Sequence, residues 1–379
     1  MRVLFITPAL TPVSGWGRYT LDLIGALVAG TPAGVGSVEA LLVTTTDSPG
    51  DSPRHRQGKG SRESAYPLLP SLTDGRRWVT PRALRAALAV RRLARSCDVV
   101  HCTVEPFAPA ALLAGRPFVL TAHGTYLPRQ VRRRGVGWLF ARAARRAAAV
   151  ICVSAYTEAQ VRAAMPGVRT TVIHNGVHWQ RLTALAENAS PPETKRGPVI
   201  LGVGQVKVRK GYHVVAAAME IVRQQYPTAE YVIIGDATSE PGLASELRAT
   251  PGVRALGRLD DEALRAWYHH ADLFALPSIN VGDKFEGFGL VYLEAGAAGL
   301  PAVAARGSGA EEAVLHEETG LLVPQNDPGA TADAILRLLR DETLRARLGE
   351  GARRHAQAHG WDQVAAQVLA VYRQVLRDR

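Results

Sequence analysis

Long hydrophobic runs and cysteine pairs are what this 379-residue sequence lacks. Its longest uninterrupted apolar run, residues 147–153, is far shorter than the roughly 18 residues of a membrane-spanning helix, so no transmembrane segment is predicted. The N-terminus leads directly into a strand-like run, without the apolar region and cleavage site of a secretory signal. The three cysteines, Cys97, Cys102 and Cys152, form no CxxC pair, which favours reduced thiols and a cytoplasmic protein.

Acidic residues are scarce in the first half of the chain. Residues 1–190 carry 24 Lys and Arg against 10 Asp and Glu, a net charge of +14, whereas the remainder carries 21 against 24, a net charge of −3. The overall charge of +11 therefore belongs to the first half. Its arginines cluster in residues 76–95 and 129–146.

The second arginine cluster has the period of an amphipathic helix. One face would carry Trp138, Arg142, Arg145 and Arg146, and the opposite face Phe140, Ala143 and Ala147. A basic face with a tryptophan at its edge suits an anionic membrane surface, and it equally suits a solvated helix of an arginine-rich protein. Nucleic acid is the weakest interpretation, because the chain has no zinc-ligand spacing, RNP-like aromatic motif or basic zipper. We therefore expect no nucleic-acid partner.

Short β-rich runs alternate with longer helical stretches along the whole chain, as in α/β domains with a parallel sheet. The predicted strands are 3–7, 38–44, 99–102, 118–122, 150–154, 171–173, 199–203, 230–235, 253–257, 273–277, 302–305 and 320–324. This pattern predicts two Rossmann-like domains facing a central cleft, residues 1–187 and 199–360, joined by a Pro-bearing linker at 188–198. The Ser-, Pro- and Gly-rich segment 47–70 is expected to form a long loop of the first domain.

The most informative stretch is residues 285–301, FEGFGLVYLEAGAAGLP, which follows a predicted strand and opens a helix. Its two glycines on either side of Phe288 permit a tight turn that exposes main-chain amides at the helix N-terminus, a favourable place for a phosphate. Glu286 and Glu294 are about two helical turns apart. One carboxylate can then address a group on the near side of a bound diphosphate, and the other can reach hydroxyls on its far side.

This stretch resembles the E-x7-E signature of the family 4 retaining glycosyltransferases, which have the two-domain GT-B fold. Further segments match in the family's order over nearly the whole chain. They are the glycine loop 8–19 (PALTPVSGWGRY), 121–125 (TAHGT), 172–177 (VIHNGV), 202–204 (GVG) with 209–211 (RKG), 270–278 (HADLFALPS), 307–312 (GSGAEE), 318–323 (ETGLLV) and 360–362 (GWD). In this fold the last helix, here residues 361–379, crosses back to pack on the first domain.

The resemblance implies a hexosyltransferase with a nucleoside-diphosphate sugar donor, UDP- or GDP-linked, and no metal or other cofactor. The residues implied at the catalytic centre are His123, Glu286, Arg209 and Lys210. Those implied in donor binding are Gly15, Gly17, Gly287, Phe288, Gly289, Leu290 and Glu294. The cationic pair would stabilise the leaving diphosphate, and Glu294 would accept both ribose hydroxyls. The acceptor is expected to be anionic or lipid-linked, at the inner face of the membrane.

Other classes of protein fit less well. A Rossmann oxidoreductase would need a GxGxxG motif after the first strand of a domain, with an acidic residue about 20 positions later, and neither domain has both. An epimerase or a phosphorylase of the same architecture stays open. The alternative from another class is a basic, peripheral membrane-binding protein with a GT-B-like fold and no transferase activity, which leaves the paired glutamates without a purpose.

Overall fold

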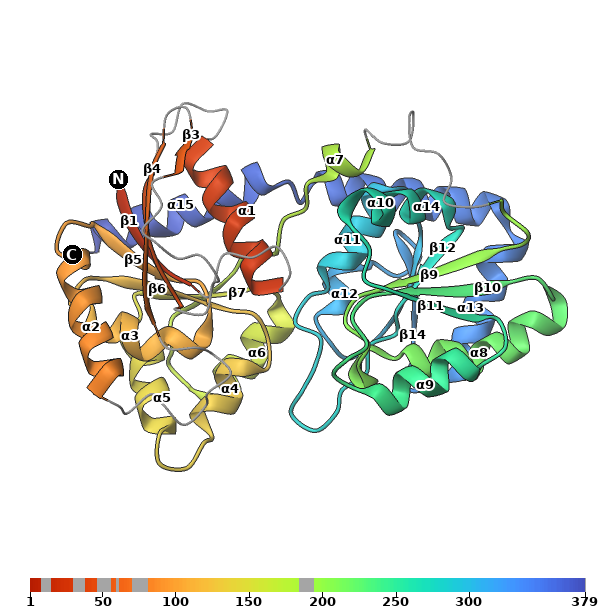
Figure 1. Cartoon of the computed structure of the whole chain (residues 1–379), viewed down its shortest axis with the longest axis horizontal. Helices are drawn as coiled ribbons and strands as arrows, with labels where there is room; N and C mark the ends of the chain where they lie inside the picture. Colours follow the sequence, from red (N-terminus) through yellow and green to blue (C-terminus); the bar gives the residue numbers. More distant parts are fainter. Residues whose placement is uncertain are drawn as a thin grey trace. The chain divides into compact units, whose positions relative to one another are not determined.

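A parallel sheet runs through the N-terminal half of the chain, as the computed structural model shows (Figure 1). The structure describes residues 1–7, 15–29, 38–45, 56–58, 61–69, 81–183 and 194–378. These residues form two compact α/β units, Met1–Gly176 with Trp361–Arg379, and Val177–Gly360.

The elements of the first unit alternate as the sequence predicts. They are β1 (Arg2–Ile6), α1 (Gly15–Ala29), β2 (Glu39–Thr45), β3 (Arg56–Gly58), β4 (Ser61–Leu69), α2 (Pro81–Ala94), β5 (Val99–Cys102), the 3-10 helix η1 (Glu105–Phe107), α3 (Ala108–Leu113), β6 (Phe118–Ala122), α4 (Tyr126–Val131), α5 (Gly137–Arg146), β7 (Ala149–Cys152), α6 (Ala155–Ala164), β8 (Thr170–Val172) and α15 (Trp361–Arg377). The sheet order is β3-β4-β2-β1-β5-β6-β7-β8. All pairs are parallel except β3 with β4.

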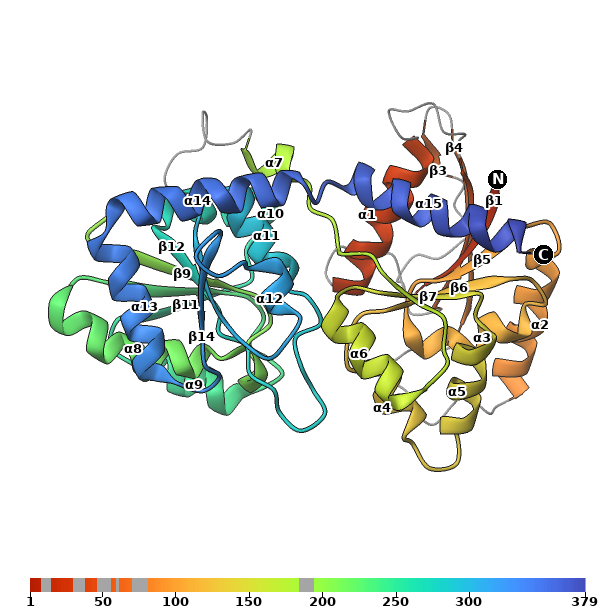
Figure 2. The same cartoon turned by 180° about the vertical axis from the view of Figure 1, so that it is seen from behind.

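Each face of this sheet has its own hydrophobic core because side chains of a strand point alternately to opposite faces. Leu4 and Ile6 of β1 pack in the core shared with helices α2 to α6. Val3 and Phe5 pack on the other face, in the core that α1 and α15 cover. Figure 2 shows α15, the last helix of the chain, lying along the first unit.

The second unit has a six-stranded parallel sheet in the order β11-β10-β9-β12-β13-β14. Its elements are α7 (Trp179–Thr183), β9 (Val199–Val203), the 3-10 helix η2 (Val208–Lys210), α8 (Tyr212–Gln225), β10 (Glu230–Ile234), α9 (Pro241–Ala249), β11 (Val253–Gly257), α10 (Asp261–His270), β12 (Leu273–Ala275), α11 (Leu290–Ala297), β13 (Ala302–Ala305), α12 (Ala310–Ala313), β14 (Gly320–Val323), α13 (Pro328–Arg340) and α14 (Glu342–Gln357). Both sheets thus have the α/β class predicted from the sequence.

The prediction of a long loop at 47–70 is wrong for the part that the structure describes. Residues 61–69 form β4, which pairs with β2, and residues 56–58 form β3 on its other side. Pairing with β4 satisfies the main-chain groups along the edge of β2, a long-range gain that local composition does not reveal. Residues 47–55, 59, 60 and 70 lie outside the described residues.

The division between the units lies between Gly176 and Val177, earlier in the chain than the predicted boundary at 187. The reason is a set of contacts within the second unit: the Val177 amide donates to the His359 carbonyl at 2.8 Å, and α7 packs against α11. Most of the predicted linker 188–198, up to residue 193, lies outside the described residues. None of the described helices is long and apolar enough to span a membrane.

Candidate active site

Two neighbouring strands of the second unit lead into the segments that hold most of the predicted site residues. The chain order reverses between β9 and β12, which lie side by side in the sheet. Arg209 and Lys210 follow β9, and Glu286 follows β12. Because parallel strands end at one edge of the sheet, both segments reach the topological switch point, where open α/β sheets bind ligands.

Gly211 brings these two segments together. Its φ of +75° is in the left-handed region, and a Cβ at this position would lie 2.1 Å from the carbonyl oxygen of Pro277. Only glycine therefore permits this close approach without strain. The Ile279 amide donates to the Arg209 carbonyl at 2.8 Å, which fixes the turn of η2 on the loop after β12.

The side chain of Glu286 is nearly buried between the two cations. Its Oε2 accepts from Lys210 Nζ at 2.5 Å, from an Arg209 guanidinium nitrogen at 3.3 Å and from Ser278 Oγ at 3.3 Å. Burial opposes ionisation of the carboxyl, but Lys210 and Arg209 outweigh it and lower the pKa of Glu286 to about 2. Burial lowers the pKa of Lys210, against the attraction of Glu286. The structure thus brings three predicted residues into one charged cluster.

The helix that follows, α11, begins at Leu290 without a side-chain cap. Gly289 stands before it with a φ of +92°. The Phe288 side chain is only 1% exposed, so the ring belongs to the core. On the helix itself, Glu294 Oε2 accepts from the hydroxyl of Tyr268 on α10 at 2.9 Å. Tyr268 is a neighbour that the sequence analysis did not single out.

In the first unit, His123 follows β6 at the carboxyl edge of the sheet. Its Nε2 lies 2.8 Å from the carbonyl oxygen of Thr103, and its ring packs edge-on against Tyr19, with centroids 4.6 Å apart. Burial lowers the pKa of His123 to about 4, so the imidazole is neutral at pH 7. Gly15 begins α1 and Gly17 is buried within it, whereas residues 8–14 of the predicted glycine loop lie outside the described residues.

Sequence reasoning missed Glu105, which contacts His123 directly. Its Oε1 accepts from the His123 main-chain amide at 2.7 Å. Burial raises the pKa of the Glu105 carboxyl to about 7. A usable signal was present, because Glu105 lies three residues beyond the end of β5, the strand that neighbours β6.

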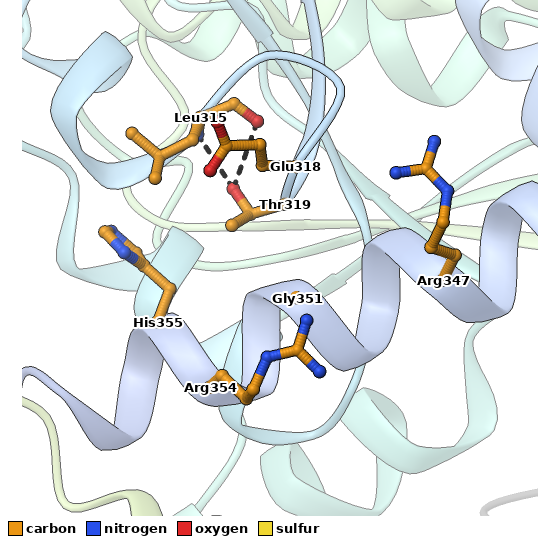
Figure 3. A pocket seen from close by; sticks show the side chains of 7 residues that line it. All are labelled: Leu315, Glu318, Thr319, Arg347, Gly351, Arg354 and His355. Carbon is orange, nitrogen blue, oxygen red and sulfur yellow. Dashed lines mark hydrogen bonds between the residues drawn. The ribbon is translucent and has the colours of Figure 1, made fainter.

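A cavity of about 480 Å³ lies elsewhere in the second unit, against α14 (Figure 3). It holds none of the predicted site residues. Its lining is Leu315, Glu318, Thr319, Arg347, Gly351, Arg354 and His355. The arginines each have a glutamate within ion-pair distance, Glu317 for Arg347 and Glu350 for Arg354. No cluster of three metal-ligating side chains occurs in the part of the chain that the structure describes.

Comparison with known proteins identifies the family. A model described as Glycosyltransferase Family 4 matches residues 13–181, and one described as Glycosyl transferases group 1 matches residues 186–355. A phosphatidyl-myo-inositol mannosyltransferase of Propionibacterium freudenreichii is 35% identical over 283 residues, 73% of this chain and 70% of that protein. The chain belongs to glycosyltransferase family 4.

Other relatives of this family 4 member match over different lengths. A D-inositol 3-phosphate glycosyltransferase of Jonesia denitrificans is 38% identical over 197 residues, 49% of this chain and 45% of that protein. The match therefore spans about half the length of that relative. A GDP-mannose-dependent alpha-(1-6)-phosphatidylinositol monomannoside mannosyltransferase of Mycobacterium tuberculosis is 28% identical over 97% of both chains.

Solved structures give the same fold for this family 4 member. The sucrose-phosphate synthase of Thermosynechococcus elongatus superposes with a TM-score of 0.81 over the full length of both chains, at 24% identity. Anabaena HepE, in complex with UDP and glucose, superposes with a TM-score of 0.72 over 98% of both chains, at 20% identity. The fold is therefore GT-B, with two Rossmann-like units, as the sequence resemblance predicts.

Proposed function

We propose that this family 4 member is a retaining hexosyltransferase, which moves a hexose from a UDP- or GDP-linked sugar to an acceptor hydroxyl. The observation that carries the proposal is the cluster in which Lys210 and Arg209 hold Glu286. It lies at the switch point of the second sheet, where open α/β sheets bind nucleotides.

The donor diphosphate binds to the cations of this cluster and to nearby main-chain amides. Arg209 has five N–H donors and Lys210 three, so each keeps donors beyond those directed at Glu286. The amides from Gly287 to Leu290 add donors at the uncapped start of α11. For Gly15 and Gly17, at the start of α1 in the first unit, we keep the donor-binding role that the family resemblance implies.

The remaining predicted residues hold the nucleoside and the sugar. Glu294 accepts from the ribose hydroxyls, because a carboxylate offers lone pairs to a vicinal diol. Glu286 orients hydroxyls of the hexose near the anomeric carbon. For His123 of the first unit, the family resemblance implies a contact on the C6 side of the sugar. The neutral imidazole suits contact with an uncharged hexose.

The reaction then needs no metal and no covalent enzyme intermediate. The acceptor oxygen attacks the anomeric carbon from the face that the diphosphate leaves, so the new bond has the configuration of the old one. As the bond from the anomeric carbon to the phosphate oxygen breaks, a phosphate oxygen takes the proton of the acceptor hydroxyl. Arg209 and Lys210 stabilise the negative charge that develops on the leaving group.

The acceptor is an anionic molecule, inositol-bearing or lipid-linked, that meets the enzyme at the cytoplasmic face of the membrane. Two relatives are a D-inositol 3-phosphate glycosyltransferase and a phosphatidyl-myo-inositol mannosyltransferase, whose names contain inositol phosphate groups. Electrostatics support this assignment, because residues 1–190 carry the whole positive excess. On α5, Trp138 is 66% exposed and Arg142, Arg145 and Arg146 are exposed, while Phe140 is buried. This face suits a membrane surface.

The test begins with the donor. The full chain is titrated calorimetrically with UDP, GDP and their glucose, mannose and N-acetylglucosamine conjugates, and release of nucleotide is measured with inositol phosphates and phosphatidylinositol as acceptors. We expect one nucleotide to bind and its sugar to be transferred with an unchanged anomeric configuration by NMR. Tight binding to anionic vesicles without any nucleotide binding would contradict the proposal and indicate a non-catalytic membrane-binding protein.

A further inference from the structure

Glu105 is an ionisable side chain in a place that disfavours charge. It begins η1, three residues beyond the end of β5, and its side chain is 0% exposed. Its Oε1 accepts from the His123 amide, but its Oε2 has no hydrogen-bond partner among the described residues. A buried carboxyl oxygen without a hydrogen bond lowers the stability of the folded protein, and another interaction must offset this loss.

No lysine or arginine in the described part of the chain acts on the Glu105 carboxyl. The titratable groups that feel its charge are Tyr126 on α4, Cys102 on β5 and Cys152 on β7. Burial is the largest influence on its carboxyl, and the neutral main-chain N–H groups of Glu105 itself and of His123 act against it.

His123 is held at two points by the same short segment. The Thr103 carbonyl can only accept, so His123 Nε2 carries the proton and Nδ1 is the basic nitrogen of the ring. Two residues further on, Glu105 fixes the main chain of His123 at 2.7 Å. Thr103 thus determines the tautomer and Glu105 the backbone position from which the ring projects.

We propose that Glu105 is a positioning residue, whose carboxyl oxygen anchors the His123 main chain so that the imidazole stays on Thr103 as the Nε2–H tautomer. The inference rests on the proposed function only in assigning His123 to the donor sugar. The anchoring itself concerns the first unit alone, and the NMR spectrum of the His123 ring measures it independently of activity.

The test compares two variants of the full-length protein. Glu105→Met fills similar space without an acceptor, whereas Glu105→Gln keeps an acceptor oxygen. Cys102→Ala, at a buried neighbour whose thiol donates to the Val104 carbonyl, is the control for lost packing. Turnover, nucleotide affinity and the His123 ring nitrogens, assigned by NMR against His123→Ala, are measured for each.

We expect Glu105→Met to lower kcat by about 100-fold, the typical cost of misplacing a catalytic group by 1 Å. Its nucleotide affinity should stay within about twofold of the parent, because Arg209, Lys210 and Glu294 belong to the other unit. Its His123 ring should lose the single tautomer. Glu105→Gln and Cys102→Ala should keep the parent ring spectrum and most of the turnover. A parent-like ring spectrum in Glu105→Met, or equal loss in the Met and Gln variants, would overturn the proposal.

Failure of the proposed function is distinguishable from failure of this inference. If the parent transfers no sugar, the His123 ring spectra of the variants still report anchoring. If Glu105→Met does not fold, the His123 amide of the parent serves instead: its proton shift should titrate with a midpoint near 7, and that titration should vanish in Glu105→Gln. An amide titration that persists unchanged in Glu105→Gln would refute the hydrogen bond.

Discussion

Glu286 illustrates how one side chain serves both stability and the proposed chemistry. Its two cationic neighbours stabilise it as a carboxylate, and Lys210 in turn depends on it because the lysine is nearly buried. Removing one partner of such a pair strands the other charge, whereas removing both does not. Stability and activity can therefore be separated at this cluster.

We predict that Glu286→Ala lowers the free energy of unfolding by about 3 kcal/mol, because Lys210 is left buried without its partner. The double variant Glu286→Gln/Lys210→Met should recover most of that stability and none of the turnover. Chemical denaturation and a nucleotide-release assay measure the two effects. Turnover that recovers together with stability would show that the cluster is only structural.

Glu105 gives the protein a pH dependence of the opposite sign to that of Glu286. Its folded pKa of about 7 is above the unfolded value of about 4.5, so its contribution to stability is present below pH 4.5 and lost as the pH rises through 7. We predict that the unfolding free energy of Glu105→Gln, relative to the parent, rises between pH 5 and pH 8 by up to about 3 kcal/mol. Urea titrations at both pH values test this, and a constant difference would contradict it.

Among the elements, α5 has an amphipathic pattern that the structure confirms. Phe140, Ala143 and Ala147 are buried, whereas Trp138 and the arginines of its other face are exposed. The pattern could be predicted from the sequence because a helix of period 3.6 fixes which residues share a face. A vesicle-binding experiment with variants of this helix tests what the exposed face contacts.

We predict that Arg142→Glu/Arg145→Glu/Arg146→Glu weakens binding to vesicles of 30% anionic lipid by about 100-fold or more, since each arginine near such a surface contributes about 1 kcal/mol. Cosedimentation measures the loss. Arg248→Glu/Arg340→Glu/Arg354→Glu makes the same charge change at exposed positions of the second unit and should have a much smaller effect. An equal loss of vesicle binding in both triple variants would show that the effect depends on net charge alone.

At the scale of the whole molecule, the last helix of the chain and its first strand share one hydrophobic core. Tyr372 of α15 is fully buried, and its hydroxyl lies 2.5 Å from Nδ1 of His101 on β5. The other ring nitrogen of His101 lies 2.7 Å from Thr121 Oγ1. The first unit therefore depends on residues from both ends of the chain.

We predict that Tyr372→Phe destabilises the first unit by about 1–3 kcal/mol, because the His101 nitrogen is left unpaired in the core. Two units with separate cores should unfold in two calorimetric transitions. The variant should lower the transition of the first unit, and the bound nucleotide should raise that of the second. A single transition that responds to both changes would contradict this division.

Much of the fold could be predicted because its signals are local. The strands 99–102, 118–122, 199–203 and 302–305 have the bounds predicted from the sequence, since buried parallel strands are short apolar runs. The edge strand 253–257 also has its predicted bounds. The strand β4 could not be predicted, because its polar residues pair at a sheet edge that only the folded chain provides. Roles of the individual site residues stay predictions until the variants are measured.

The sequence by itself determined the α/β class, the alternation of elements and the glutamate pair of the family motif, because these follow from period and spacing. Only the tertiary structure decided that Lys210 and Arg209 meet Glu286, some 76 positions away in sequence, and that Glu105 anchors the main chain of His123. Such contacts depend on strand order, which places the ends of β9 beside β12 and of β5 beside β6. Burial and the neighbouring charges together then set the charge of each group, and both are properties of the packed chain.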